Sequence, residues 1–441
     1  MAQVAALETT GTENHPLAIR MAVIAGLSHN MIIGCLMGSF SVMLVSVEER
    51  MGVTREMSSG VGALVIFGSA LMSSFVGPLM AKHSLRLLMS LGAFLSLAGY
   101  LLLAFTNSYS LYVGSYLMLF GPSMAIAGAV GPATLVTRWF DRNRGLALGL
   151  VHLSLVVAVM PLLCNWMLEE HGARAVYLLM AGLVGVILLP ATLAIRDYPP
   201  GSASGANAGQ TESSLPVAEA VDDFVPSTDD PLAEAGKLAP GPESQADSMT
   251  VGQILATPAF WALTITAAMV ITGIMVLTFN MIPLAESLGI DRDRGALLQS
   301  IMAFSGMAGS IIFGWVADRL GGARGIALLA FNSAVLLILL QLDLPFAALA
   351  VVIGLLGLHG AGMIPNISRA LAFSLGQGSF SRAFGLQSAL SVPFTAVGIW
   401  AMGAAFTRTG SYSVALIGVL VAMFVTVPFA LWAAKRPFNP A

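Results

Sequence analysis

Four ionisable side chains stand inside long apolar stretches of the sequence: His29, His152, His359 and Arg369. Ionisable groups are costly in an apolar environment, and where they occur there they usually carry function. Imidazole gains and loses a proton near neutral pH, whereas a guanidinium stays positive and attracts anions. We therefore expect His29, His359 and His152 to carry a coupling proton. We also expect Arg369, together with His359 and His29, to contact an anionic ligand.

Each of these side chains also has a simpler interpretation. A buried histidine can be a neutral packing residue, and Arg369 can be an anchor whose head reaches the membrane surface. At ~1.5 Å per helical residue, His359 lies near the middle of its stretch and His29 and His152 about 6 Å from the middle. Arg369 lies about 14 Å from the middle. The sequence leaves both interpretations open.

Uncharged polar side chains in the same stretches supply further candidates, each able to bind a ligand or another helix: Asn30, Tyr116, Asn280, Gln299, Asn366 and Gln387. Carboxylates occur only at the ends of the stretches, at Glu48, Glu49, Glu286 and Asp343. A buried carboxylate relay is thereby excluded. Cys35 and Cys164 do not have the spacing of metal ligands, so we expect no metal and no cofactor.

The elements that must position these residues are membrane-spanning helices. With 57% hydrophobic and only 10% charged residues, the chain has too few polar side chains to cover a water-exposed globule. A span of ~30 Å takes about 20 helical residues, and continuous apolar runs exclude the alternation of a barrel. Twelve such runs are present, near 20–47, 59–81, 86–106, 110–137, 145–168, 173–195, 258–285, 294–317, 324–343, 346–375, 382–407 and 411–434. The predicted fold is an all-α integral membrane protein.

An internal repeat divides the twelve runs into two sets of six. The octet at 49–56 has a similar octet 237 positions later, at 286–293. The same offset relates Gly77 to Gly314 and Lys82 to Arg319. An offset of 238 relates Arg144 to Arg382. Duplicated apolar halves are typical of secondary transporters, which place substrate between the halves.

The predicted organisation has five parts: an N-terminal tail (1–19), a six-helix half (20–195), an acidic disordered linker (196–250), a second six-helix half (251–434) and a C-terminal tail (435–441). The loops on the side of the termini and linker hold thirteen Lys and Arg residues, against six on the other side. The positive-inside rule therefore predicts cytoplasmic termini in a multi-pass protein of the cell membrane, presumed to be a bacterial inner membrane.

One loop motif makes the comparison with known families specific. After the eighth run, Gly314, Asp318, Arg319 and Gly321, followed by Arg324, look like a G-x-x-x-D-R-x-G-R loop. Twelve spans with this motif resemble the major facilitator superfamily, in which the loop stabilises one of the alternating states. The first-half copy keeps Gly77, Lys82 and Arg86 but has Ala81 at the position of the acid and Ser84 at that of the glycine. The resemblance implies that spans one, four, seven and ten line the cavity, which favours His29, His359 and Arg369 over His152.

Two further stretches, 282–290 and 138–149, are similar to the monocarboxylate-porter and oxalate/formate-antiporter branch. That branch usually places an arginine in span eight to hold the substrate carboxylate, and here Ser310 stands at that position.

The leading hypothesis is a secondary active transporter, acting as a monomer in the lipid bilayer, for a small organic anion such as a monocarboxylate. Transport is expected to be proton-coupled or to proceed by exchange. The alternatives are an exporter of amphiphilic compounds and a transporter-like sensor acting through 196–250. No nucleophile–base pair or nucleotide loop is present, so neither an enzyme nor a nucleic-acid partner is expected.

Overall fold

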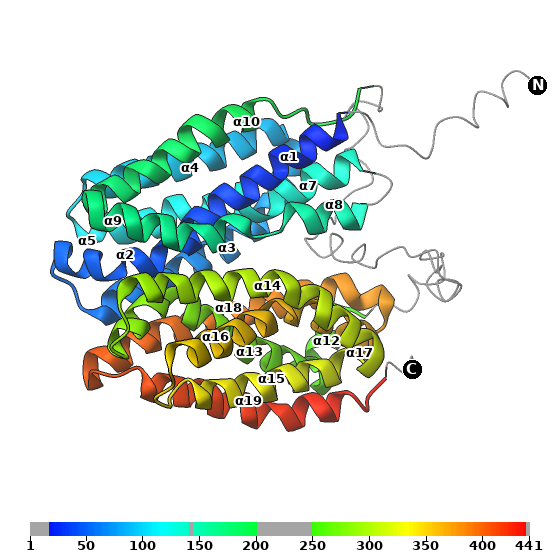
Figure 1. Ribbon diagram of the computed structural model, residues 1–441. Helices are drawn as coiled ribbons and strands as arrows, with labels where there is room; N and C mark the ends of the chain where they lie inside the picture. The colour runs from blue at the N-terminus through cyan, green and yellow to red at the C-terminus, as the bar shows by residue number, and fades with distance from the viewer. Residues whose placement is uncertain (1–16, 141–143, 201–248, 438–441) are drawn as a thin grey trace, which may run out of the picture.

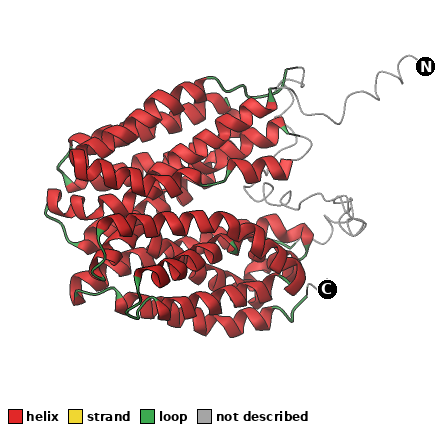
Figure 2. Ribbon diagram, viewed as in Figure 1, coloured by secondary structure: helices red, strands yellow, loops and turns green. Residues whose placement is uncertain are grey.

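The computed structural model describes residues 17–140, 144–200 and 249–437, and every regular element in these ranges is helical (Figure 2). Most of the predicted linker and most of both predicted tails lie outside the described residues. The hypothesis of a sensor that acts through the linker therefore remains a prediction.

The first four spans differ in how regular their helices are. Span one consists of α1 (Ala18–His29), the π-helical segment η1 (Asn30–Gly34) and α2 (Cys35–Met51), and spans two and three are α3 (Arg55–Lys82) and α4 (Leu85–Phe105). Span four consists of α5 (Tyr109–Ser115), η2 (Tyr116–Phe120), α6 (Gly121–Ser123), η3 (Met124–Val130) and α7 (Gly131–Trp139), of which η2 and η3 are π-helical.

Spans five and six form one apolar stretch with a sharp turn inside it. The stretch comprises α8 (Arg144–Val151), α9 (Leu155–Gly182), η4 (Leu183–Leu188) and α10 (Leu189–Leu193). Its 48 residues from Leu146 to Leu193 would measure about 72 Å as a straight helix, more than twice the bilayer core. Gly172 turns the chain with φ 78° and ψ 173°. The 11 long apolar segments of the described residues therefore contain twelve spans.

The second half repeats this arrangement after a short helix, α12 (Val251–Ala256). Its spans are α13 (Pro258–Ser287), α14 (Arg292–Leu320), α15 (Gly322–Leu339), α16 (Phe346–Ala361) with α17 (Met363–Leu375), α18 (Phe380–Thr409) and α19 (Ser413–Ala433). A single 3₁₀ turn, η7 (Gln377–Ser379), precedes α18. The prediction of an all-α membrane fold in two six-helix repeats is confirmed.

The duplication is visible in the backbone as well as in the sequence. Spans two, three and four begin at Arg55, Leu85 and Tyr109, and the helices 237 residues later begin at Arg292, Gly322 and Phe346. Glycines with positive φ recur at matching turns: Gly52 at 64° and Gly289 at 75°, Gly172 at 78° and Gly410 at 70°. These turns need a residue without a Cβ penalty, which explains why glycine survives in both copies.

The two halves lie side by side with all spans roughly aligned, and the first residue of α1 and the last of α19 lie at the same end of the bundle (Figure 1). We call this end the termini end. Between the halves, α3 packs against α18, α9 against α14, and α2 against α13. Gly403 lets α18 approach α3 closely, because a Cβ there would lie 2.5 Å from the Arg55 carbonyl oxygen.

A pair of glycine substitutions in α14 tests the packing of the second half. A Cβ at Gly309 would lie 2.0 Å from the Leu358 carbonyl oxygen of α16, whereas a Cβ at Gly314 meets nothing within 4 Å. We expect Gly309→Ala to lower stability by about 1–3 kcal/mol through overpacking. Gly314→Ala should leave stability unchanged or raise it by up to about 1 kcal/mol, because alanine favours helix. Thermal unfolding in detergent measures both, and equal effects of the two substitutions would contradict the packing described.

Candidate transport site and gates

Three spans of the first half lose regular α-helical geometry where they meet. Span one is π-helical over η1, span four over η3, and span five is broken at His152–Ser154, with Ser154 at φ −82° and ψ 54°. The contacts between η1 and η3 and between η1 and α9 bring the three irregular segments together. Irregular backbone at membrane depth is tolerated where it is buried in protein or lines a cavity, and π-bulges are frequent at functional sites. We call this place the helix-break junction.

Pro132 explains one feature of the junction. Proline has no backbone N–H, so Pro132 leaves one carbonyl of the preceding turn without a backbone donor: that of Gly128 in α-helical register, or that of Ala127 in the π-helical register of η3. The His29 ring supplies a hydrogen bond here, with Nδ1 2.7 Å from the Gly128 oxygen. Beside it the Ser28 hydroxyl donates to the Ala127 oxygen at 2.6 Å. Polar side chains of span one thus form hydrogen bonds to backbone carbonyls of span four.

His29 and His152 form a pair at the junction. Their ring centroids are 4.6 Å apart, with 59° between the ring planes. His152 donates from Nδ1 to the Leu148 oxygen at 2.9 Å, and His29 is only 6% exposed. Because the Gly128 carbonyl can only accept, the proton of a neutral His29 sits on Nδ1 and leaves Nε2 as the basic atom. Nε2 has no hydrogen-bond partner among the described residues.

Asn30 joins span one to the broken span five. Its Nδ2 donates to the Gly26 oxygen at 3.0 Å, and its Oδ1 accepts from the Val156 backbone N–H at 3.1 Å. Val156 is the second residue of α9, where backbone N–H groups lack partners within the helix. Both polar atoms of Asn30 are thus bonded within the protein, and the residue holds the two irregular segments in register.

A second set of polar side chains crosses between the halves near the end opposite the termini. Asn280 of α13 accepts at Oδ1 from the Ser59 hydroxyl at 2.8 Å, and the Ile282 backbone N–H donates to the Ser41 hydroxyl at 2.8 Å. Gln299 of α14 donates to the Met37 carbonyl at 3.3 Å. We call Ser41, Ser59, Asn280 and Gln299 the interhalf seam.

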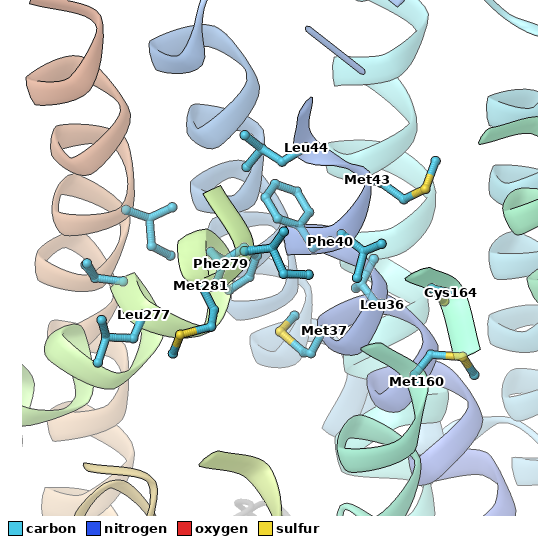
Figure 3. Packing of buried hydrophobic residues seen from close by; sticks show 14 of the residues in the cluster. Leu36, Met37, Phe40, Met43, Leu44, Met160, Cys164, Leu277, Phe279 and Met281 are labelled. Atoms are coloured by element: carbon cyan, nitrogen blue, oxygen red, sulfur yellow. The ribbon is translucent and has the colours of Figure 1, made fainter. Parts of the chain in front are cut away.

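Apolar contacts accompany the seam. Figure 3 shows Met37 and Phe40 of span one facing Phe279 and Met281 of span seven, and the rings of Phe40 and Phe279 are 4.8 Å apart. The Tyr116 ring also packs against Phe40, with 5.6 Å between the ring centroids, and Tyr116 is 2% exposed. The predicted candidates Asn280, Gln299 and Tyr116 are therefore close to one another, at a place where the two halves touch.

A charged cluster closes the same end. Arg55 forms an ion pair with Glu48 of its own half and donates a hydrogen bond to the Tyr412 hydroxyl of the other half. The Arg55 guanidinium also lies 4.8 Å from the centre of the Phe406 ring. Burial raises the pKa of Tyr412 to about 12, so its hydroxyl remains protonated at physiological pH. We call Glu48, Arg55 and Tyr412 the latch.

The sequence does not single out the latch, because its residues lie at or beyond the ends of the apolar stretches, where polar side chains are common. A second cross-half contact there, from Asn165 Nδ2 to Asp293 Oδ1 at 2.6 Å, also went unpredicted. The available signal was Asn165 itself, an amide in an apolar run.

The loop motif after span eight forms an ion pair with Arg369, a residue expected to bind ligand. Arg369 of α17 forms an ion pair with Asp318 at the end of α14, and the two side chains are 51% and 64% exposed. Arg319 instead lies over the Trp315 ring at 4.0 Å, and Gly321 ends α14 with φ 83°. Arg369 thus lies at the termini end, apart from the helix-break junction.

The corresponding loop of the first half uses a backbone acceptor. There Arg138 of α7 donates to the Met80 carbonyl at 2.9 Å. The Arg86 backbone N–H donates to Asp197 Oδ1 at 2.9 Å and so ties the start of α4 to the residues after α10. Both loops are therefore fastened to a neighbouring span by an arginine, one through a carboxylate and one through a carbonyl.

His359 and Asn366 lie within the second half. His359 Nδ1 is 3.3 Å from the Ser333 hydroxyl, and its ring meets Phe313 at 5.3 Å. Asn366 donates to the Phe313 and Gly362 carbonyls at 3.1 and 2.8 Å. Both side chains fasten span ten to its neighbours. His359 is not brought together with the pair of His29 and His152.

Comparison with known proteins agrees with this architecture. The model of the Major Facilitator Superfamily matches residues 26–389. The uncharacterised MFS-type transporter YcxA of Bacillus subtilis strain 168 is 24% identical over 171 residues, which is 37% of this chain and 40% of that protein.

A solved structure shares the fold across nearly the whole chain. It is a bacterial homologue of the human lysosomal transporter Spinster in an inward-facing and unoccupied conformation, with a TM-score of 0.68 at 14% identity. The alignment covers 98% of this chain and 100% of that one. Twelve spans in two repeats and a family match over most of the sequence lead to one conclusion: the chain belongs to the major facilitator superfamily.

Proposed function

We propose that this transporter carries a small organic anion, a monocarboxylate, together with a proton that binds the pair of His29 and His152. The observation that carries the proposal is the contact between two imidazoles at a junction of three interrupted helices. Twelve spans without an internal carboxylate leave histidine as the side chain suited to reversible protonation. A proton on this pair is a buried positive charge, which an anion nearby stabilises. Proton and anion then favour each other's binding.

Alternating access follows from the distribution of contacts between the halves. The seam, the latch and the pair of Asn165 and Asp293 all lie toward the end opposite the termini. With the termini in the cytoplasm, as the positive-inside rule predicts, that end is the outer one. We infer that the described conformation is closed outside and that transport requires these contacts to break.

Arg369 is assigned to the inner mouth in this scheme. Its guanidinium is more than half exposed and is held by Asp318. An anion at the cytoplasmic mouth competes with that carboxylate for the same cation. Arg369 would thus attract substrate before it reaches the helix-break junction, and His359, which packs among Ser333 and Phe313, would not contact it.

The first prediction concerns proton coupling. Glutamine can donate to the Gly128 carbonyl but does not titrate, so His29→Gln and His152→Gln should abolish accumulation driven by a pH gradient while exchange without a gradient persists. For one proton per monoanion, a one-unit gradient supports about tenfold accumulation. Uptake of a panel of radiolabelled monocarboxylates into proteoliposomes measures this.

His359→Gln is the matched control, because His359 is as buried as His29 but has no second imidazole beside it in the described structure. It should retain accumulation. Loss of coupling in His359→Gln, with coupling intact in the other two variants, would overturn the assignment of the proton site.

The second prediction separates the two roles of Arg369. If it attracts substrate, Asp318→Asn frees the guanidinium and should lower KM, whereas Arg369→Gln should raise KM. The changes should be about threefold, since the pair is exposed and screened by salt. Similar losses of transport rate in both variants would instead assign the ion pair to the loop's conformational role alone.

The third prediction tests opening at the seam. The Ser59 and Asn280 side chains are in hydrogen-bond contact across the halves. In the double variant Ser59→Cys/Asn280→Cys, oxidation should join the halves and stop transport, and a reductant should restore it. Ser59→Cys alone, treated with the same oxidant, serves as control. Undiminished transport by a chain whose crosslink is verified by mass spectrometry would exclude opening at this seam.

A further inference from the structure

A cluster of tyrosines lies inside the first half, and one of its members, Tyr116, contacts Phe40 beside the interhalf seam. Tyr100 of α4, Tyr112 of α5, Tyr116 of η2 and Tyr177 of α9 are each no more than 2% exposed. Phe120 holds two of the rings together, with Tyr100 at 4.7 Å and Tyr116 at 5.1 Å. The Tyr100 hydroxyl interacts electrostatically with those of Tyr116 and Tyr177.

Several polar atoms of this cluster lack partners. The hydroxyls of Tyr100 and Tyr177 are fully buried without a hydrogen-bond partner among the described residues. Burying an unpaired hydroxyl in an apolar interior is unfavourable, because the group loses its hydrogen bonds to water and gains none in the protein. Phenylalanine would fill the same space without that cost, so the hydroxyls themselves need an explanation.

Arg50 adds a positive charge at the edge of the cluster. Its guanidinium lies 5.5 Å from the Tyr177 ring centre, and one nitrogen donates to the Leu103 carbonyl at 3.1 Å. Its Nε is buried and unpaired within the described part of the chain, where no ion pair to Arg50 is formed. The nearby Glu48 carboxylate is held by Arg55. A partly buried guanidinium without a carboxylate calls for a counter-ion.

The second half provides an internal control for packing. At an offset of 237, Tyr100, Tyr112 and Tyr116 correspond to Leu337, Leu349 and Ile353, and Arg50 corresponds to Ser287. All three aliphatic residues are buried to a similar degree as the tyrosines. The fold therefore packs well at this position without hydroxyls and without a cation, and the polar version in the first half has another purpose.

The hydrogen-bond donors of the cluster indicate what kind of ligand it would bind. Phenol hydroxyls and a guanidinium are hydrogen-bond donors, and the two thiols nearby, Cys35 and Cys164, are weak donors. Among the described residues, no carboxylate interacts electrostatically with the Tyr100 or Tyr177 hydroxyl. We propose that Arg50, Tyr100 and Tyr177 bind a small monovalent inorganic anion of halide size inside the first half. Arg50, Tyr100 and Tyr177 all belong to the first half and are none of the residues that the proposed function uses, so this site does not depend on that function.

Thermal unfolding in sodium chloride and in sodium gluconate of equal concentration tests this site, because gluconate is an organic anion much larger than the halide proposed to bind. Chloride should raise the melting temperature of the wild type by about 2 °C or more. The double variant Tyr100→Phe/Tyr177→Phe should be at least as stable as the wild type in gluconate, since it removes unpaired buried hydroxyls, but should lose the chloride shift.

Tyr109→Phe is the matched control, because it removes a tyrosine hydroxyl that bonds to the Met57 carbonyl near the surface. It should keep the full shift. Crystals soaked in bromide should show an anomalous peak within hydrogen-bond distance of Arg50 and Tyr177. Equal melting temperatures of the wild type in the two salts, an unchanged shift in the double variant, or water alone in the density would overturn the proposal.

Discussion

The structure depends on one constraint: within a bilayer, every backbone N–H and C=O must find a partner inside the protein. Regular helices meet it automatically, and most spans here are regular. The exceptions are informative because at two of the breaks a side chain of span one bonds to a backbone group that lacks its usual helical partner. Pro132 removes a donor from span four and His29 approaches the Gly128 carbonyl. The break in span five exposes the Val156 N–H, and Asn30 accepts from it.

This matching explains why the candidate site lies in the first half. A side chain that replaces a backbone bond is held in one orientation, and an imidazole so held has a defined basic atom. The second half contains a histidine of similar burial, but its neighbours are a hydroxyl and an aromatic ring. Although duplication produced two similar scaffolds, only the first half brings two imidazoles together at irregular backbone.

The sequence was sufficient to predict the spans, the duplication and the superfamily, because hydrophobic length and turn glycines act locally. It was also sufficient to nominate His29 and His152 separately. It could not predict their contact, since contact depends on how helices rotate about their own axes, and π-helical segments change that rotation by part of a turn. For the same reason the partner of Arg369 was missed, although Asp318 belonged to a motif already recognised. Contacts between the ends of distant spans leave no periodic signal in the sequence.

The composition of the latch has a consequence for how quickly the halves can separate. Glu48 and Arg55 belong to the same half, so their ion pair moves as one body and survives opening. The contacts of Arg55 that cross the boundary are its hydrogen bond to the Tyr412 hydroxyl and the approach of its guanidinium to the Phe406 ring. A charge-assisted hydrogen bond of this kind contributes about 1.5–3 kcal/mol, far less than separating two buried charges would cost. The activation barrier at this point is thereby kept low, and the cluster aligns the halves as they close without making closure irreversible.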